Sequence, residues 1–374
     1  MKAKIAPVHP DFGAAVWPLS LTDHNGNPKM KPSRFVGVWT ATVAAAVIAI
    51  GAALSAQAQA FQSGFRMLKV PYYDGYIDVA LWYPSNAAEA DRSFGAYRMQ
   101  VSMNAQAALG KFPLVVVSHG TGGSSLSHYR FALALARSGF VVAAPEHPGD
   151  NYRDRSLVAD ARYGYERPRQ VSRVLDDLLA DPEWKDRIDS DRIGAIGHSA
   201  GGATVAALIG GVPDRNRVRT HCQTVKEDPA CAFRDPKLGV APGGPAPLAL
   251  PASVAASGSV SDPRIRAAVL LAPFGVPFVP GSFKESRATV LLIGAEHDEA
   301  LARQYNYEYL RQQLPFAAAR LAAGAGHYSF IAPPVAEFRA AFGPAAQDPQ
   351  GFDREAFQAQ LSGEFVEFFS KALR

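Results

Sequence analysis

A serine held between glycines has the clearest chemical potential in this sequence. Residues 197–201 (GHSAG) match the pattern G-x-S-x-G, between an expected short strand at 192–196 and an expected helix of small apolar residues at 199–209. A sharp turn from strand to helix needs glycines because larger side chains would collide there, and it lifts the serine hydroxyl clear of the sheet beside a helix N-terminus. The pattern predicts that Ser199 is the nucleophile of an acyl-transfer reaction.

A histidine far along the chain is the expected base. A serine hydroxyl needs a base to take its proton, and after a serine in a strand-to-helix turn the partners follow in the order acid, then histidine. His327 lies in the glycine-rich segment GAGHYSF at 324–330, after an expected strand at 318–321. This position predicts that His327 reaches Ser199.

The acid that orients this histidine should follow the preceding strand, which is expected at 289–293. That strand leads into the segment GAEHDE at 294–299. We predict that Asp298 is the acid. Glu296 remains the alternative, because either carboxylate could follow the turn.

Two backbone N–H groups are needed to stabilise the oxyanion that forms when a serine attacks a carbonyl. The N–H of Ala200, directly after the nucleophile, is one expected donor. The other is the N–H of Thr121 in the loop SHGTGGS at 118–124, whose glycines let the backbone approach a substrate closely. This loop follows a continuous apolar strand at 114–117 and matches no phosphate-binding pattern.

These residues need a scaffold of alternating strands and helices. An antiparallel strand pair is expected at 66–83, with its turn at residues 74 and 75. Continuous apolar strands separated by helices then predict an α/β fold with a parallel sheet covered on both faces. The further strands are expected at 140–144 and 266–271, and the further helices at 129–137, 168–179, 302–314 and 352–373.

An insertion at about 212–262 interrupts this alternation. It is rich in Pro, Gly, Ala and Ser, and its position after the Ser199 helix predicts a cap over the active site. It contains the only two cysteines, Cys222 and Cys231, which we expect to form a disulfide if the protein is exported. Free thiols are the alternative, and His221 lacks enough neighbouring ligands for a zinc site.

The N-terminal residues 1–60 predict a leader with a secretory signal peptide. Residues 35–56 are uncharged, Lys31 and Arg34 precede them, and the small-x-small sequence AQA follows at 58–60. We therefore expect a periplasmic or secreted protein without stable membrane insertion after cleavage. An uncleaved membrane anchor is the alternative, because the run is long enough to cross a bilayer. Met30 is a possible true start.

Composition excludes other classes of protein. The chain has 374 residues, 48% of them hydrophobic and 19% charged, which is typical of a globular enzyme. Its net charge of +4 is not concentrated in a basic run, so nucleic-acid binding is not indicated. We expect residues 61–374 to form one domain that acts on a small-molecule ester without a metal or organic cofactor. The sequence does not determine the oligomeric state.

Five segments together resemble a known group of proteins. SHGTGGS, APEHPGDN, RIGAIGHSAGG, LLIGAEHDE and GAGHYSF are similar to segments of bacterial proteins described as predicted dienelactone hydrolases, a group that looks related to platelet-activating-factor acetylhydrolases. The resemblance covers roughly residues 65–374. It implies an α/β-hydrolase fold and a serine esterase acting on short acyl groups, with Ser199, Asp298 and His327 as the triad and Thr121 and Ala200 as oxyanion donors.

The resemblance also has limits. Dienelactone hydrolases use a cysteine nucleophile where this chain has Ser199, so their substrate is not implied. His119 and the segment 148–150 also match the group's motifs and are expected either to shape the pocket floor or only to pack, and His198 is a further candidate pocket residue. Acyl transfer to an alcohol or peroxide, and a non-catalytic binding protein of the same fold, are the alternative functions.

Overall fold

The computed structural model describes residues 61–234 and 248–374. The predicted leader and signal peptide at 1–60, with the possible start at Met30 and the alternative membrane anchor, lie outside the described residues, as does the part of the predicted cap at 235–247. In the part of the chain that is described, no helix has the length and apolar character needed to span a membrane.

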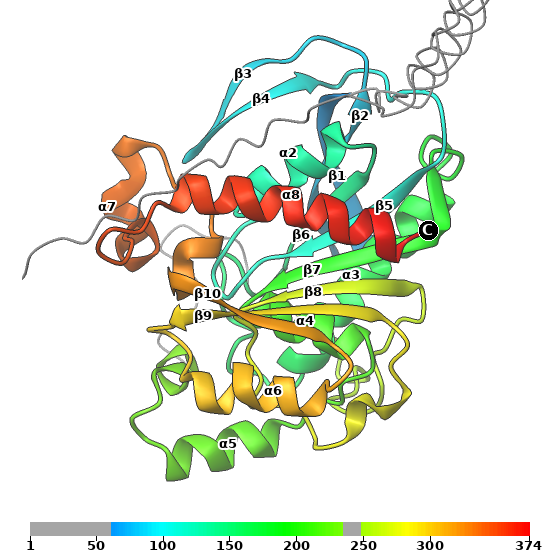
Figure 1. Cartoon of the computed structure of the whole chain (residues 1–374). Coiled ribbons are helices and arrows are strands. Elements are labelled where there is room, and N and C mark those ends of the chain that lie inside the picture. The colour runs from blue at the N-terminus through cyan, green and yellow to red at the C-terminus, as the bar shows by residue number, and fades with distance from the viewer. Residues whose placement is uncertain (1–60, 235–247) are drawn as a thin grey trace, which may run out of the picture. The chain divides into compact units, whose positions relative to one another are not determined.

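The described residues form a sheet of ten strands in the order β10-β9-β8-β7-β5-β6-β2-β1-β4-β3 (Figure 1). The six strands from β10 to β6 run parallel to their neighbours, and β2 and β1 continue the sheet in antiparallel register. The predicted mostly parallel sheet is therefore confirmed. The strands are β1 (Gln62–Tyr72), β2 (Gly75–Ser85), β3 (Ala90–Phe94), β4 (Tyr97–Met103), β5 (Phe112–Ser118), β6 (Val141–Glu146), β7 (Ile188–His198), β8 (Ile265–Leu271), β9 (Thr289–His297) and β10 (Ala318–Gly326).

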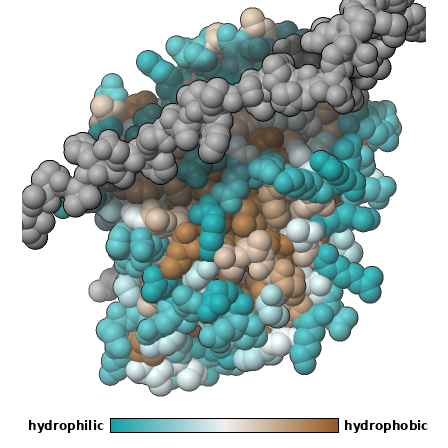
Figure 2. Space-filling model, viewed as in Figure 1, coloured by the Kyte–Doolittle hydropathy of each residue, from teal (hydrophilic) through white to brown (hydrophobic). Residues whose placement is uncertain are grey.

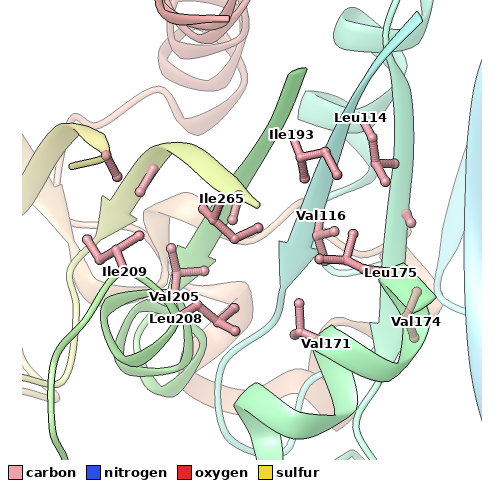
Figure 3. Packing of buried hydrophobic residues seen from close by; sticks show 14 of the residues in the cluster. Leu114, Val116, Val171, Val174, Leu175, Ile193, Val205, Leu208, Ile209 and Ile265 are labelled. Atoms are coloured by element: carbon pink, nitrogen blue, oxygen red, sulfur yellow. The ribbon is translucent and has the colours of Figure 1, made fainter. Parts of the chain in front are cut away.

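Helices cover both faces of this sheet, as predicted. On one face α2 (Tyr129–Arg137) and α8 (Arg354–Ala372) lie together, and their apolar side chains pack on the sheet (Figure 1). On the other face α3 (Tyr163–Ala180), α4 (Ala200–Leu208) and α6 (Tyr307–Gln313) form a second core with the strands. Figure 3 shows this second core, where α3 and α4 point aliphatic side chains at β5, β7 and β8.

The parallel strands bring their following loops to one edge of the sheet. The segments after β5, β7, β9 and β10 carry the predicted catalytic residues: Thr121, Ser199 with Ala200, Asp298 and His327. The remaining helical segments lie in the connections: α5 (Arg215–Thr224), η1 (Pro229–Arg234), η3 (Ser282–Glu285), η4 (Arg303–Tyr305), η5 (His327–Phe330), η6 (Ala336–Phe338), α7 (Arg339–Phe342) and η7 (Gly343–Ala346). Figure 2 shows mainly hydrophilic residues on the face that carries α8, with a hydrophobic group near its centre.

Several elements differ from the expectation. The helix expected at 302–314 is broken at Asn306, whose buried side chain donates to the carbonyl of Ala302 and accepts from the N–H of Gly275, both at 2.9 Å. These bonds tie the chain to the loop after β8, and η4 and α6 form instead of one helix. Helix α3 begins at Tyr163, ahead of the expected start at Pro168, and β3, β4 and α5 were not predicted.

Candidate active site

Ser199 occupies a strained turn between β7 and α4. Its φ of 56° and ψ of −118° lie in a backbone region that residues other than glycine rarely adopt, at a cost of about 1–3 kcal/mol. Backbone bonds hold it there: its N–H donates to the carbonyl of Leu271 at 2.9 Å, and its carbonyl accepts from Ala203 and Phe274 at 3.0 Å. The turn keeps a half-buried serine side chain in one place.

The glycines of the motif are required by close backbone packing. A Cβ on Gly197 would lie 2.1 Å from the carbonyl oxygen of Gly201, and a Cβ on Gly201 would lie 1.9 Å from that of Ser118. Both distances are far below van der Waals contact, so larger residues would force the turn and the end of β5 apart.

His327 and Asp298 form a buried pair at the ends of β10 and β9. Nδ1 of His327 lies 3.0 Å from the carboxylate of Asp298, and the two side chains are 3% and 7% exposed. Oδ1 of Asp298 also accepts the backbone N–H groups of Ala300 and Leu301, at 3.1 and 2.8 Å. These bonds fix the carboxylate against the imidazole ring.

The other carboxylates of this segment face elsewhere. The side chain of Glu296 is 45% exposed and accepts the N–H of Gly324 at 2.7 Å. The carboxylate of Glu299 accepts the backbone N–H of His327 at 2.8 Å, so it holds the loop and not the ring. The structure therefore brings Asp298, and not Glu296, to the ring of His327.

Helix α8 braces the loop that carries His327. Nε2 of Gln358 donates to the carbonyls of Ser329 and Ile331, at 2.9 and 2.7 Å, and Arg354 donates to the carbonyl of Ile331 at 3.3 Å. Both side chains are buried. The position of His327 thus depends on contacts with α8 as well as on β10.

The loop after β5 lies against Ser199. A Cβ on Gly120 would lie 3.2 Å from the Cβ of Ser199, which shows how closely the backbone passes. Ala200 opens α4, where the first N–H groups have no acceptor within the helix. Thr121 and Ala200 line the same cavity as Ser199 and His327.

This cavity has a volume of about 170 Å³. For scale, an engineered apolar cavity of about 150 Å³ binds benzene. Part of its wall comes from α5 and η1, through Val218 and Ala230. Most of its other side chains are apolar, among them Val158, Ala161, Pro168, Ala203, Pro213, Phe274, Pro277, Phe278, Leu301 and Ile331. The cavity beside Ser199 is therefore small, and most of its exposed lining is apolar.

The two histidines predicted to shape the pocket take different places. His198 lines the cavity, donates from Nε2 to the carbonyl of His327 at 2.9 Å, and places its ring 4.8 Å from the His327 ring. His119 is buried and bonds through Nδ1 to the carbonyl of Gly120 and through Nε2 to the N–H of His147. His119 therefore supports the loop and does not belong to the cavity wall.

The sequence analysis did not predict several residues that support the loop after β5. Arg167 and Tyr163 of α3 line the cavity, and Asp150, which the sequence analysis placed only within an expected pocket segment, pairs with Arg167. One signal was present in the sequence: Arg167 precedes Val171 and Val174 on the apolar stripe of α3, where a charged side chain must find a buried partner.

Four buried histidines around the site predict a loss of stability in acid. Burial lowers the pKa of His119, His147 and His198 well below the ordinary value, and that of His128 to about 3. In the unfolded chain the same side chains have the ordinary histidine pKa of about 6.5. The unfolded state then binds more protons than the folded state at lower pH, so stability is present above this value and is lost as the pH falls.

We expect the free energy of unfolding to fall by up to about 5 kcal/mol per pH unit between about pH 5.5 and 4.5, because each neutral buried histidine contributes about 1.4 kcal/mol per unit. Urea denaturation at a series of pH values measures this slope. His128→Phe should lower the slope by about 1.4 kcal/mol per pH unit. His297→Gln is the control, since the side chain of His297 is 63% exposed. Equal slopes in the two variants would contradict the prediction.

The two cysteines are joined. Cys222 of α5 and Cys231 of η1 form a disulfide, with their Cα atoms 5.6 Å apart. Beside it, Nε2 of His221 lies 2.6 Å from the carboxylate of Asp228, which also accepts the N–H of Ala230. The disulfide and this pair both connect α5 to η1, the two elements that contribute to the cavity wall.

Known proteins similar to this chain carry related names. The sequence profile of the alpha/beta hydrolase family matches residues 114–341. Platelet-activating factor acetylhydrolase of Bos taurus is 28% identical over 164 residues, covering 31% of this chain and 36% of that protein. The same enzyme of Cavia porcellus is 24% identical over 205 residues, covering 40% of this chain and 47% of that protein. The chain thus spans less than half the length of these relatives.

A solved structure has the same fold. Ferulic acid esterase from Streptomyces cinnamoneus aligns with a TM-score of 0.56 and 21% identity, over 85% of this chain and 92% of that chain. At this identity the likeness concerns the fold. Since the family profile covers more than half of the chain and the sheet has the matching architecture, the protein belongs to the alpha/beta hydrolase family.

Proposed function

We propose that this protein is a serine hydrolase of carboxylic esters, with Ser199 as nucleophile, His327 as base and Asp298 as the acid that orients the base. The buried His327–Asp298 pair at 3.0 Å, on the wall of the cavity that Ser199 also lines, is the observation that carries the proposal. The names of the similar proteins, an acetylhydrolase and an esterase, support it.

The reaction would proceed in two halves. Ser199 Oγ attacks the ester carbonyl while Nε2 of His327 accepts its proton, and the negative oxygen is stabilised by the N–H groups of Thr121 and Ala200. His327 then returns the proton to the departing alkoxide, which leaves as the alcohol. Water attacks the acyl-enzyme by the same route, giving the acid and free Ser199.

Labelling with a fluorophosphonate tests the mechanism. The probe should form one covalent adduct, located at Ser199 by peptide mass spectrometry, because only an activated serine attacks it. Heat-unfolded protein is the control and should not react. Intact folded protein that takes no label would favour a non-catalytic binding protein and overturn the proposal.

We further propose a short acyl group, because a cavity of about 170 Å³ with apolar walls holds a group near the size of benzene. A panel of nitrophenyl esters should give the highest kcat/KM for acetate to butyrate and a decline toward decanoate. A maximum at long chains would show that the substrate lies in a site other than this cavity.

Export and a cap complete the proposal. We propose that the protein is exported, since disulfides such as Cys222–Cys231 persist in oxidising compartments. We also propose that the insertion at about 212–262 caps the active site, because Val218 and Ala230 line the cavity on elements that the disulfide joins.

Replacing both cysteines with serine tests the cap. Closing a loop of about ten residues contributes only roughly 2–3 kcal/mol, and here it constrains α5 and η1 more than the sheet. We expect KM and selectivity among esters to change more than the melting temperature. Reductant should change the wild type in the same direction and leave the double variant unaffected. Unchanged kinetics on every ester would contradict the cap.

A further inference from the structure

A buried arginine connects the loop that carries Thr121 to the helix that carries Ala200. Arg167 of α3 is 1% exposed. Its Nη2 donates to the carbonyl of His119, in the Thr121 loop. Its Nε donates to Oγ1 of Thr204 at 3.0 Å, and that hydroxyl donates to the carbonyl of Ala200 at 2.9 Å. One rigid guanidinium thus contacts both elements that would supply oxyanion donors.

Asp150 holds the same loop at a second point, the N–H of Gly122. The carboxylate is fully buried and lies 2.6 Å from Nη1 of Arg167. Its Oδ1 accepts the N–H of Gly122 at 2.9 Å, and its Oδ2 accepts the hydroxyl of Tyr163 at 2.7 Å. The Tyr163 oxygen is also 3.1 Å from Oγ1 of Thr121. Burial and the Asp150 charge raise the pKa of Tyr163, so its hydroxyl remains a donor.

Stability alone gives little reason for this pair. Moving two charges into the protein interior carries a desolvation cost that their attraction often only balances, and apolar replacements of such pairs are often neutral or stabilising. The bonds, however, fix the carbonyl of His119 and the N–H of Gly122 on either side of Thr121, and connect them to Ala200. A shift of about 1 Å in a catalytic group can cost about a hundredfold in rate.

We propose that Arg167 and Asp150 are positioning residues that set the Thr121 and Ala200 N–H groups at the spacing required to bind one oxyanion. This proposal rests on the proposed function, because it assigns the arrangement of donors that esterolysis would use. It predicts an effect on the transition state that exceeds the effect on substrate binding.

A second ion pair on the same helix, in which the carboxylate is buried and the arginine side chain is 29% exposed, provides a control. Arg169 lies 2.7 Å from Glu166, whose carboxylate is fully buried and accepts the hydroxyl of Tyr72 at 2.6 Å. Arg169 also donates to the carbonyl of Ala255 at 2.9 Å. Neither Arg169 nor Glu166 lines the cavity. Arg167→Met and Arg169→Met each leave one buried carboxylate without its arginine, and a thermal melt of both variants compares their stability losses directly.

Kinetics separate positioning from stability. For Arg167→Met we expect kcat to fall by about a hundredfold, as for a lost or misplaced oxyanion donor, with KM within about threefold of the wild type. Affinity for an alkylboronic acid, whose tetrahedral adduct places an oxygen at the donors, should fall by a similar factor. Arg169→Met should retain both. Equal kcat in the two variants would overturn the proposal.

Hydrogen exchange tests the same connection without activity. Exchange of the peptide covering 119–123 should be faster in Arg167→Met than in Arg169→Met, because the Gly122 N–H loses a fixed acceptor. Arg167→Lys gives the same comparison if the methionine variant does not fold, since one ammonium cannot reach all three groups. Equal exchange in the two variants overturns the proposal about Arg167, whether or not the protein is active. Failure of the wild type to react with fluorophosphonate instead overturns the proposed function.

Discussion

Replacing Ser199 with alanine is expected to lower kcat by about a millionfold, the size of the effect measured for the nucleophile in the subtilisin series. The change removes only Oγ, and the backbone bonds from Leu271, Ala203 and Phe274 that hold the turn remain. The melting temperature should therefore stay near that of the wild type. Hydrolysis of nitrophenyl acetate and a thermal melt measure the two quantities.

An exposed serine provides the control for this experiment. Ser190 is exposed near the start of β7, at the opposite end of the strand from Ser199, and Ser190→Ala should leave kcat unchanged. Activity of Ser199→Ala within tenfold of the wild type would show that another residue is the nucleophile. A large loss of melting temperature would instead show that Oγ holds the turn.

Replacing Asp298 with asparagine is expected to lower kcat by about ten-thousandfold, because the wrong tautomer of His327 would be favoured. The geometry around Asp298 supports a fall in kcat. Oδ1 of Asp298 accepts two backbone N–H groups, so an asparagine would keep its oxygen there and turn its NH₂ group toward His327. Nδ1 of His327 would then accept a hydrogen bond from the amide, so the ring proton would lie on Nε2, which could not act as base.

Glu296→Gln is the matched control for this variant. The Glu296 carboxylate accepts the N–H of Gly324 and lies 4.0 Å from the exposed ring of His297, and we expect less than a threefold change in kcat, on the order of an exposed polar substitution. If the two variants show the reverse pattern, Glu296 is the acid.

Sequence patterns predicted the turn between β7 and α4 at Ser199 because its requirements are local. The strand, the glycines and the small helix around Ser199 lie within one short segment, and the close contacts of Gly197 and Gly201 explain why that segment has few alternatives. The choice between Glu296 and Asp298 could not be made in the same way. It depends on where β9 ends and on the backbone bonds that Asp298 makes to residues 300 and 301.

Sequence patterns could not predict the contacts between segments that lie far apart in the chain. The pairing of Arg167 with Asp150 joins α3 to the loop after β6, and the break at Asn306 depends on Gly275 after β8. Such pairs are set by how the strands are ordered in the sheet, which apolar periodicity does not reveal. The placement of His119 behind the loop is a further example, since its partner is His147.

The support of His327 by α8 bears on when the protein can become active during synthesis. A ribosome completes β7 and the Ser199 turn first, then Asp298, then His327, and only afterwards the helix whose Gln358 and Arg354 hold the base loop. A growing chain therefore carries Ser199 long before His327 is held beside it. If these residues act as proposed, hydrolysis would begin only after α8 has docked.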